Sequence, residues 1–244
     1  MLSYLAAQVG PVGAVAIARD LGIPRSSAYH LLAEMSTLGY VVHFPEEERW
    51  GLGVAAFEVG SAYLRHDPLE RMATPVLTSL VRDVGERVAL VAHLGILHGR
   101  ETMYLLKFAT GKPLTLVTEV GVRLPASLTA TGRAILAQTD RAQVRALFEN
   151  DAAFVLRTGA GPASPAQLRE LLAVERERGY AEEDGLITEG FASVAVAVHD
   201  HAHRPIAAIG VTFRSADVDK AERTQLAGIV SRRANRLSHR LGEK

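Results

Sequence analysis

A predicted helix near the start of the chain carries residue types that could read DNA. Helical spacing of Ala28, Leu31 and Leu32 predicts this helix over Arg25–Thr37. Its first two turns hold Arg25, Ser26, Ser27, Tyr29 and His30. Arginine can donate a bidentate pair to guanine, whereas serine hydroxyls and the helix N-terminus can hold phosphate.

Short elements on either side should position this helix. Helices are predicted over Leu2–Gln8 and Ala14–Asp20, followed by a tight turn. A hairpin of Tyr40–Phe44 and Arg49–Leu52 comes after the candidate helix. Three helices and a hairpin describe a winged helix-turn-helix, whose recognition helix can lie in the major groove. We expect Arg49, on the wing, to reach a neighbouring phosphate or the minor groove.

The charge of this segment leaves a second interpretation open. Residues 1–66 hold four arginines and no lysine against six acidic residues, a formal charge of −2. The whole chain balances 27 basic against 27 acidic residues. Because DNA-binding surfaces usually carry a basic excess, a winged helix that binds a protein partner and no DNA stays the alternative.

The rest of the chain mixes helices and strands. We expect a winged-helix domain over 1–53, a linker helix over 54–67, and a second domain over 68–244, which begins where Asp67-Pro68 interrupts the chain. Further helices are predicted over Leu69–Val84, Thr129–Ala137, Asp140–Phe148, Pro165–Arg178 and Val218–Leu241. Strands are predicted over Arg87–Leu94, Glu101–Phe108, Pro113–Thr118, Ser193–Val198 and Ile206–Phe213. This order predicts an α+β fold with helices packed on a largely antiparallel sheet.

The start of one of these helices could bind an anion. In the segment PASLTATGRAILA, Thr129, Thr131 and Gly132 fall where backbone N–H groups lack helical partners. Gly132 would let a ligand approach the backbone closely, and a small carboxylate is the natural guest. Ordinary capping of the helix by Thr129 is the alternative.

Composition excludes several classes of protein. The chain has no cysteine, which rules out disulfides, thiolate zinc sites, iron–sulfur clusters and a cysteine nucleophile. A hydrophobic content of 48% excludes wholesale disorder, and the apolar runs are too short to cross a bilayer. The first residues lack the basic region of a signal peptide. We therefore expect a cytoplasmic protein without a membrane partner.

A histidine-rich segment and an isolated serine give only weak indications of a metal site or an enzyme. His199, Asp200, His201 and His203 have metal-binding chemistry, but they fall at a predicted hairpin tip, so no metal or other cofactor is expected. Ser193 has no nucleophile-elbow motif around it, and no P-loop or dinucleotide fingerprint occurs. An enzyme is therefore the weakest of the interpretations, and no catalytic residue is assigned.

Several separate motifs together resemble one family. The stretch LGIPRSSAYHLLAEMSTLGYV, the hairpin end WGLG, and the later GRAILA and GYA segments are similar in order and spacing to the isocitrate-lyase-regulator (IclR) family of bacterial transcription factors. The resemblance implies a winged helix-turn-helix, a linker helix and a GAF-like or profilin-like effector-binding domain. It also implies a ligand-responsive regulator, expected to repress, that binds a pseudo-palindromic operator as a homodimer or a dimer of dimers.

The resemblance further implies an effector site. The family's ligand touches the segment around Thr131 and Gly132 through backbone amides, and faces an acidic residue, a small polar residue and polar positions on the last strand. The matching positions here are Glu183, Ser193, Gly210 and Thr212. Glutamate replaces the usual aspartate and glycine replaces a polar residue. These changes predict a reshaped pocket for an aromatic or bulkier carboxylate, or for an amide-type derivative.

Departures from the family also fall in the DNA-reading segment. His30 stands where the family usually has arginine, and Trp50-Gly51-Leu52-Gly53 replaces a wing end that often has a basic residue. Both changes remove positive charge, so we expect an altered affinity and operator preference. The first helix is also shorter than the family's, which suggests that the natural chain begins upstream of Met1.

Overall fold

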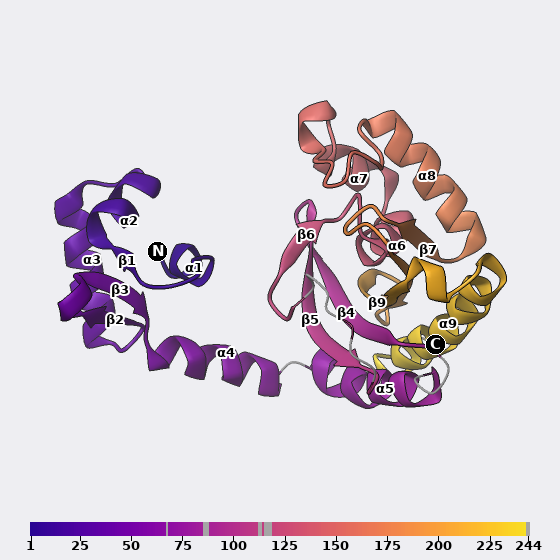
Figure 1. The fold of residues 1–244 in the computed structure, drawn as a ribbon, viewed down its shortest axis with the longest axis horizontal. Helices are drawn as coiled ribbons and strands as arrows, with labels where there is room; N and C mark the ends of the chain where they lie inside the picture. Colours follow the sequence, from indigo (N-terminus) through magenta and orange to yellow (C-terminus); the bar gives the residue numbers. More distant parts are fainter. Residues whose placement is uncertain (67, 85–87, 112–113, 115–118, 243–244) are drawn as a thin grey trace. The chain divides into compact units, whose positions relative to one another are not determined.

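The computed structural model describes residues 1–66, 68–84, 88–111, 114 and 119–242. The chain divides into two compact units, Met1–Asp67 and Pro68–Lys244 (Figure 1). Among the described helices, none combines the length and the hydrophobicity that a membrane span requires.

The N-terminal unit is a winged helix-turn-helix. Its elements are α1 (Leu2–Ala6), β1 (Val12–Gly13), α2 (Ala14–Asp20), α3 (Arg25–Thr37), β2 (Val41–Phe44), β3 (Arg49–Leu52) and α4 (Val54–His66). β3 lies between β1 and β2 in an antiparallel sheet. The predicted helices and hairpin are confirmed, although α1 ends at Ala6 rather than Gln8. β1 was not predicted, because two residues are too few to show an alternating pattern.

A small hydrophobic core fixes α3 against the rest of this unit. Its buried members are Leu5, Ala14, Ile17, Leu32 and Val41. On α3, Leu32 and Ala28 lie one turn apart on the same face, and both are fully buried. The opposite face of α3 is left to solvent, which is the arrangement that a DNA-reading helix needs.

The C-terminal unit is built on a six-stranded antiparallel sheet with strand order β6-β5-β4-β9-β8-β7. Its described strands are β4 (Leu90–His98), β5 (Glu101–Ala109), β6 (Arg123–Pro125), β7 (Ala181–Asp184), β8 (Phe191–His199) and β9 (Pro205–Arg214). Its described helices are α5 (Pro68–Val84), α6 (Ala130–Gln138), α7 (Arg141–Leu147), α8 (Pro165–Arg178) and α9 (Lys220–Arg240). The predicted α+β class is confirmed.

Helices cover both faces of this sheet (Figure 1). On one face, α5 and α9 pack on fully buried residues of the central strands such as Val211 and Phe213. On the other face, α6 lies over β8 and β9 and contacts the small buried side chains of Ala195 and Ala208. Because side chains alternate along a strand, Gly210 belongs to the α6 side of β9.

The structure corrects several predicted strands. β4 continues to His98, so most of the loop expected from Gly95 onward is strand. β4 is buried on both faces from Leu90 to Gly95, so its sequence shows no alternating pattern that would mark the strand. The strand predicted over Pro113–Thr118 lies outside the described residues apart from Leu114. β6 and β7 were not predicted, because they are only 3 and 4 residues long.

The last helix begins later than predicted, at Lys220 rather than Val218. The side chain of Asp219 accepts a hydrogen bond from the Glu222 N–H, and the Glu222 carboxylate accepts one from the Asp219 N–H, both at 2.8 Å. This capping box fixes the first turn of α9.

Candidate functional site

The predicted DNA-reading residues share an exposed stretch of α3. The exposed side chains are those of Arg25, Ser26, Ser27, Tyr29 and His30. Tyr29 leaves 51% of its surface in solvent although it is a large aromatic residue. The core of the unit therefore uses none of these five side chains, and all of them are accessible to another molecule.

The first turn of α3 is open to an anion. Pro24 occupies the N-cap position, and no described side chain caps the first N–H groups of the helix. Unpaired N–H groups at a helix N-terminus carry the positive end of the helix dipole. Such a terminus can bind a phosphate group.

The wing carries a further candidate contact. Arg49 on β3 is exposed and donates a hydrogen bond of 3.4 Å to the Pro11 carbonyl. Beside it on the hairpin, the rings of His43 and Trp50 stack with their centroids 4.4 Å apart. The stack stiffens the hairpin, and a contact between Arg49 and DNA stays a prediction.

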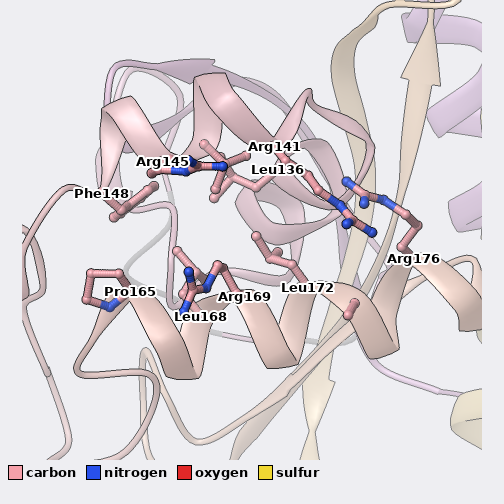
Figure 2. A pocket seen from close by; sticks show the side chains of 11 residues that line it. Leu136, Arg141, Arg145, Phe148, Pro165, Leu168, Arg169, Leu172 and Arg176 are labelled. Carbon is pink, nitrogen blue, oxygen red and sulfur yellow. The ribbon is translucent and has the colours of Figure 1, made fainter.

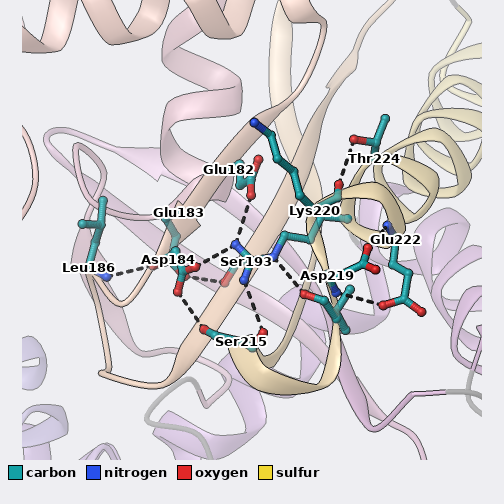
Figure 3. Close-up of polar contacts among 12 residues, drawn as sticks. Glu182, Glu183, Asp184, Leu186, Ser193, Ser215, Asp219, Lys220, Glu222 and Thr224 are labelled. Atoms are coloured by element: carbon teal, nitrogen blue, oxygen red, sulfur yellow. Dashed lines mark hydrogen bonds and ion pairs between the residues drawn. The ribbon is translucent and has the colours of Figure 1, made fainter.

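In the C-terminal unit, Glu183, Ser193 and Thr212 form a polar row across three neighbouring strands. Strand register pairs Glu183 with Ser193 and Ser193 with Thr212. Ser193 Oγ donates to Glu183 Oε1 at 2.6 Å and lies 2.9 Å from Thr212 Oγ1. The Leu186 N–H donates to the other Glu183 oxygen at 3.1 Å. Figure 3 shows the contacts of Glu183 beside the other acidic residues of β7.

Thr131 lies against the same face of the sheet as the polar row. A Cβ built on Gly210 would lie 3.5 Å from Thr131 Cγ2. The Thr131 hydroxyl is 3.2 Å from the Tyr104 hydroxyl. Gly210 pairs with Ala195 two register positions from the Ser193–Thr212 pair, so it lies on the same face of the sheet. The structure thus brings the predicted residues of α6, β7, β8 and β9 to one side of the sheet.

Gly132 serves close packing. Its N–H donates to Thr129 Oγ1 at 3.0 Å, which is the capping bond that the sequence offered as the alternative. A Cβ at this position would lie 2.4 Å from Thr102 Oγ1 and 2.5 Å from the Ala126 carbonyl oxygen. The glycine is therefore required where α6 approaches β5, and its amide is already paired. A contact between a ligand and the Gly132 backbone stays a prediction.

Two aromatic side chains on this face were not predicted as site residues. His93 pairs with Gly210 in the register of β4 and β9, and its ring centroid lies 5.0 Å from that of Tyr104. Burial lowers the pKa of His93 to about 3, with the Lys107 charge adding to the effect, so the ring is neutral. Burial raises the pKa of Tyr104 to about 12. Only the pairing of β4 with β9, far apart in the chain, reveals that His93 lies near the polar row.

The carboxyl group of Glu183 is buried, with 4% of the residue exposed. Burial raises its pKa, and the hydrogen bonds from Ser193 and from the Leu186 N–H oppose the rise. A carboxyl group with a raised pKa keeps its proton to a higher pH. In its protonated form, Glu183 can donate a hydrogen bond to an anion.

Replacement of Glu183 by glutamine should make the stability of the protein less dependent on pH. Because the folded-state pKa of Glu183 is raised above its unfolded value, the wild-type free energy of unfolding falls as pH rises through the folded-state pKa. Glutamine has no proton to lose, so the stability of Glu183→Gln relative to wild type should rise as pH increases from the usual glutamate pKa of about 4 through the raised folded-state pKa. Urea denaturation at several pH values measures the difference. Glu189→Gln, at an exposed position, is the control. If the free energy of unfolding of Glu183→Gln instead falls further below that of the wild type as pH rises, the raised pKa is contradicted.

A buried arginine supports the site from inside the unit. Arg133 Nε donates to both carboxylate oxygens of Glu175, at 3.0 and 3.1 Å. Its Nη1 donates to the carbonyls of Ser127 and Leu128, at 3.2 and 2.9 Å, and its Nη2 donates to the Glu182 carbonyl. These bonds join α6, the loop before it, α8 and β7. The sequence did not reveal this role, because nothing in GRAILA distinguishes a buried arginine from a surface one.

The histidine-rich turn between β8 and β9 is organised by Asp200. The Asp200 carboxylate accepts hydrogen bonds from the N–H groups of Ala202 and Arg204, at 2.8 and 3.0 Å, and from Arg204 Nε at 2.8 Å. The Arg204 side chain, together with these N–H groups, lowers the pKa of Asp200 to about 2. Protein donors therefore already occupy the carboxylate. Within the described residues, no three potential ligands gather as a metal site requires.

Comparison with known proteins agrees with this geometry. The family described as the IclR helix-turn-helix domain matches residues 1–44, and the family described as bacterial transcriptional regulator IclR C-terminal matches residues 61–239. The chain belongs to the IclR family. The resemblance found in the sequence motifs is thereby confirmed in both units.

Full-length relatives share the IclR-family organisation. The chain is 31% identical to the HTH-type transcriptional regulator XynR of Escherichia coli (strain K12), over 93% of this chain and 88% of the relative. It is 27% identical to the acetate operon repressor of Salmonella typhimurium, over 98% and 86%. Among solved structures, an IclR homologue complexed with 4-hydroxybenzoate from Microbacterium hydrocarbonoxydans superposes with a TM-score of 0.76 at 21% identity, covering 96% of this chain and 93% of that one.

Membership of the IclR family settles the general activity. The chain is a DNA-binding transcriptional regulator of a repressor-type family, with a ligand-binding C-terminal domain. Its relatives are regulators and not enzymes, so the prediction that this protein is not an enzyme is confirmed.

Proposed function

We propose that this IclR-family protein is a ligand-responsive repressor that reads its operator with α3. One observation carries the proposal: Arg25 stands exposed beside an uncapped helix N-terminus. Arg25 would donate a bidentate pair to guanine, and the first-turn N–H groups would hold a phosphate. The remaining contacts that we propose are made by Ser26, Ser27, Tyr29, His30 and Arg49.

We propose a homodimer, or a dimer of such dimers, as the form that binds DNA. On α4, Val54 and Phe57 are 68% and 74% exposed and lie one turn apart, so they form an apolar pair that a second copy would cover. Two copies related by a two-fold axis present two α3 helices. This arrangement fits a pseudo-palindromic operator with half-sites one or more helical turns apart.

We propose that the polar row binds the carboxylate of a small effector. When Glu183 is protonated it has a proton to donate, and the hydroxyls of Ser193 and Thr212, which now bond Glu183 and each other, can rotate to donate to a ligand instead. Tyr104 keeps its proton because its pKa is raised to about 12, so its hydroxyl is a further donor. Lys107, whose charge acts on His93, is ion-paired with Glu119 and would exchange this partner for the ligand. Together these groups can pair with both oxygens of a carboxylate.

An aromatic acid suits this site better than a small oxoacid. The neutral rings of His93 and Tyr104, whose centroids lie 5.0 Å apart, can pack on an aromatic ligand. The homologue complexed with 4-hydroxybenzoate shows that one protein of this fold binds such an acid. We therefore propose aromatic carboxylates as the first effectors to test.

The protein must have one conformation that binds DNA and one that does not. Effector binding can shift the balance between them only if the two conformations have different affinities for the effector. α4 begins at Val54, directly after the wing strand β3. We propose that α4 transmits the change, because it is continuous with the DNA-reading unit on one side and leads toward Pro68 on the other.

Replacement of Arg25 by alanine tests how α3 reads DNA. If Arg25 pairs with a guanine, Arg25→Ala should weaken binding to an operator selected from random DNA by about 1–3 kcal/mol, and weaken binding to unselected DNA much less. Fluorescence anisotropy with both DNAs measures the two losses. Arg82→Ala, at an exposed arginine of the other unit, is the matched control.

Two results would contradict the proposal that α3 reads an operator through Arg25. An equal loss on selected and unselected DNA would mean that Arg25 holds a phosphate and reads no base. Failure of the wild-type protein to select any DNA would favour a winged helix that serves a protein partner.

A further inference from the structure

A groove between α7 and α8 lies in the C-terminal unit (Figure 2). Its volume is about 370 Å³, which lies within the range of pockets that hold small organic ligands. The groove shares no lining residue with the polar row or with Thr131, Tyr104 and His93. It is therefore a candidate site separate from the proposed effector site.

The floor of the groove is apolar and already formed. Val144 and Phe148 come from α7 and its end, and Leu168 and Leu172 come from α8. All four are buried members of one hydrophobic cluster. A hydrophobic chain or ring laid on this floor would lose water contact without any rearrangement of the core.

The rim of the groove is cationic. Arg141 and Arg145 on α7 face Arg169 and Arg176 on α8 across the opening (Figure 2). No carboxylate lines the groove, and within the described part of the chain none of these four arginines forms an ion pair. Four guanidinium groups without acidic partners around one opening favour an anionic ligand.

One of the four arginines is held in place. Arg176 donates through Nε to the Ala137 carbonyl and through Nη2 to the Thr139 carbonyl at 3.1 Å, so the end of α6 fixes its guanidinium. A guanidinium has five N–H donors. Arg176 therefore keeps three N–H donors for a ligand, in a preformed orientation.

We propose that this groove binds an amphipathic organic carboxylate, with its apolar part on the floor and its carboxylate among the arginines. A purely apolar ligand would leave the arginines unused, and an inorganic anion would leave the apolar floor in water. A molecule with an apolar part and a carboxylate contacts the floor and the arginines at the same time. The proposal does not depend on the polar row binding an effector, because the two sets of residues do not overlap.

Octanoate is a suitable probe, because it joins a short hydrocarbon chain to one carboxylate. In calorimetric titrations of the full chain, octanoate should bind, whereas octanol and inorganic phosphate should bind at least tenfold more weakly. Arg145→Gln/Arg169→Gln should lower octanoate affinity at least tenfold, equivalent to about 1.4 kcal/mol. Both arginines are exposed, so the variant should fold normally. Arg232→Gln/Arg236→Gln on α9 removes the same charge from exposed positions and should leave the affinity unchanged.

Two further measurements locate the bound probe. In methyl NMR spectra, octanoate should shift the signals of Val144, Leu168 and Leu172 and leave those of Val230, in the core under α9, unchanged. Binding should persist in Ser193→Leu, whose change lies in the polar row. Shifts confined to the polar-row side, loss of binding in Ser193→Leu, or equal losses in both arginine pairs would overturn the groove site. Equal affinity for octanol would overturn the role of the arginines.

Discussion

Replacing Arg133 by methionine should lower the free energy of unfolding of the C-terminal unit by about 3–5 kcal/mol, because the buried Glu175 charge would keep only the more distant Arg178, at 3.8 Å, as an ionic partner. Arg133 and Glu175 have side chains that are only 1% and 0% exposed. Burial raises the pKa of Glu175, and the attraction of Arg133 opposes the rise. Methionine fills much of the space but donates no hydrogen bond. The Glu175 carboxylate would keep only the Glu182 N–H as a hydrogen-bond donor, and the three carbonyls that now accept from Arg133 would lose its N–H groups.

Urea denaturation followed by far-UV circular dichroism measures this loss. The single tryptophan, Trp50, lies in the other unit, so its fluorescence reports separately whether the winged helix stays folded. Arg123→Met is the matched control, because Arg123 pairs with Glu101 at 4.0 Å with both side chains about half exposed. That exposed pair should contribute no more than about 1 kcal/mol.

A double variant separates the ion pair from simple packing. Arg133→Met/Glu175→Met removes both charges, so it should recover a large part of the stability that Arg133→Met loses. A loss below about 1 kcal/mol in Arg133→Met, the size expected of a surface pair, would show that Arg133 does not hold α6, α8 and β7 together.

Replacing Ser193 by leucine should abolish the response to an effector while DNA binding is kept. The Ser193 hydroxyl joins Glu183 to Thr212, at 2.6 and 2.9 Å. Leucine removes this hydroxyl and places an apolar side chain in the middle of the polar row. A carboxylate at this point would lose a donor and meet a steric block, whereas the DNA-reading residues belong to the other compact unit.

Anisotropy of operator DNA, titrated with 4-hydroxybenzoate and benzoate, measures the response. Ser193→Thr keeps the hydroxyl and should retain most of the response. Ser231→Leu makes the same change on α9 and should respond as the wild type does. If an acid changes the operator binding of the wild type and of Ser193→Leu equally, the effector site lies elsewhere.

The elements with strong local signals were predicted correctly. Helix α3 was predicted over its observed range, Arg25–Thr37, because Ala28 and Leu32 recur at helical spacing. Helix α8 was also predicted over its observed range, Pro165–Arg178, since Pro165 starts it and Gly179, in the left-handed conformation at φ 82°, ends it. Strand β7 was missed, because three of its four residues are acidic and give no alternating hydrophobic pattern.

Prediction of the candidate sites required knowledge of contacts between residues far apart in the chain, unlike prediction of the helices. Family resemblance supplied the positions of Glu183, Ser193 and Thr212, and the strand register then accounts for their contacts. His93 was not predicted as a site residue, because its place beside the polar row requires the pairing of β4 with β9. Gly132 was predicted as a ligand contact, and the side chain of Thr102, distant in sequence, is a separate reason why a glycine is needed there.

Helix α3 should read a specific operator. The most direct test is fluorescence anisotropy of the purified protein with the DNA upstream of its own gene and with random DNA, at two salt concentrations. Non-specific binding, which depends on phosphate contacts, should fall steeply as salt rises. We expect preferential binding to the upstream DNA that persists at the higher salt. Equal binding to both DNAs, lost together as salt rises, would contradict the claim.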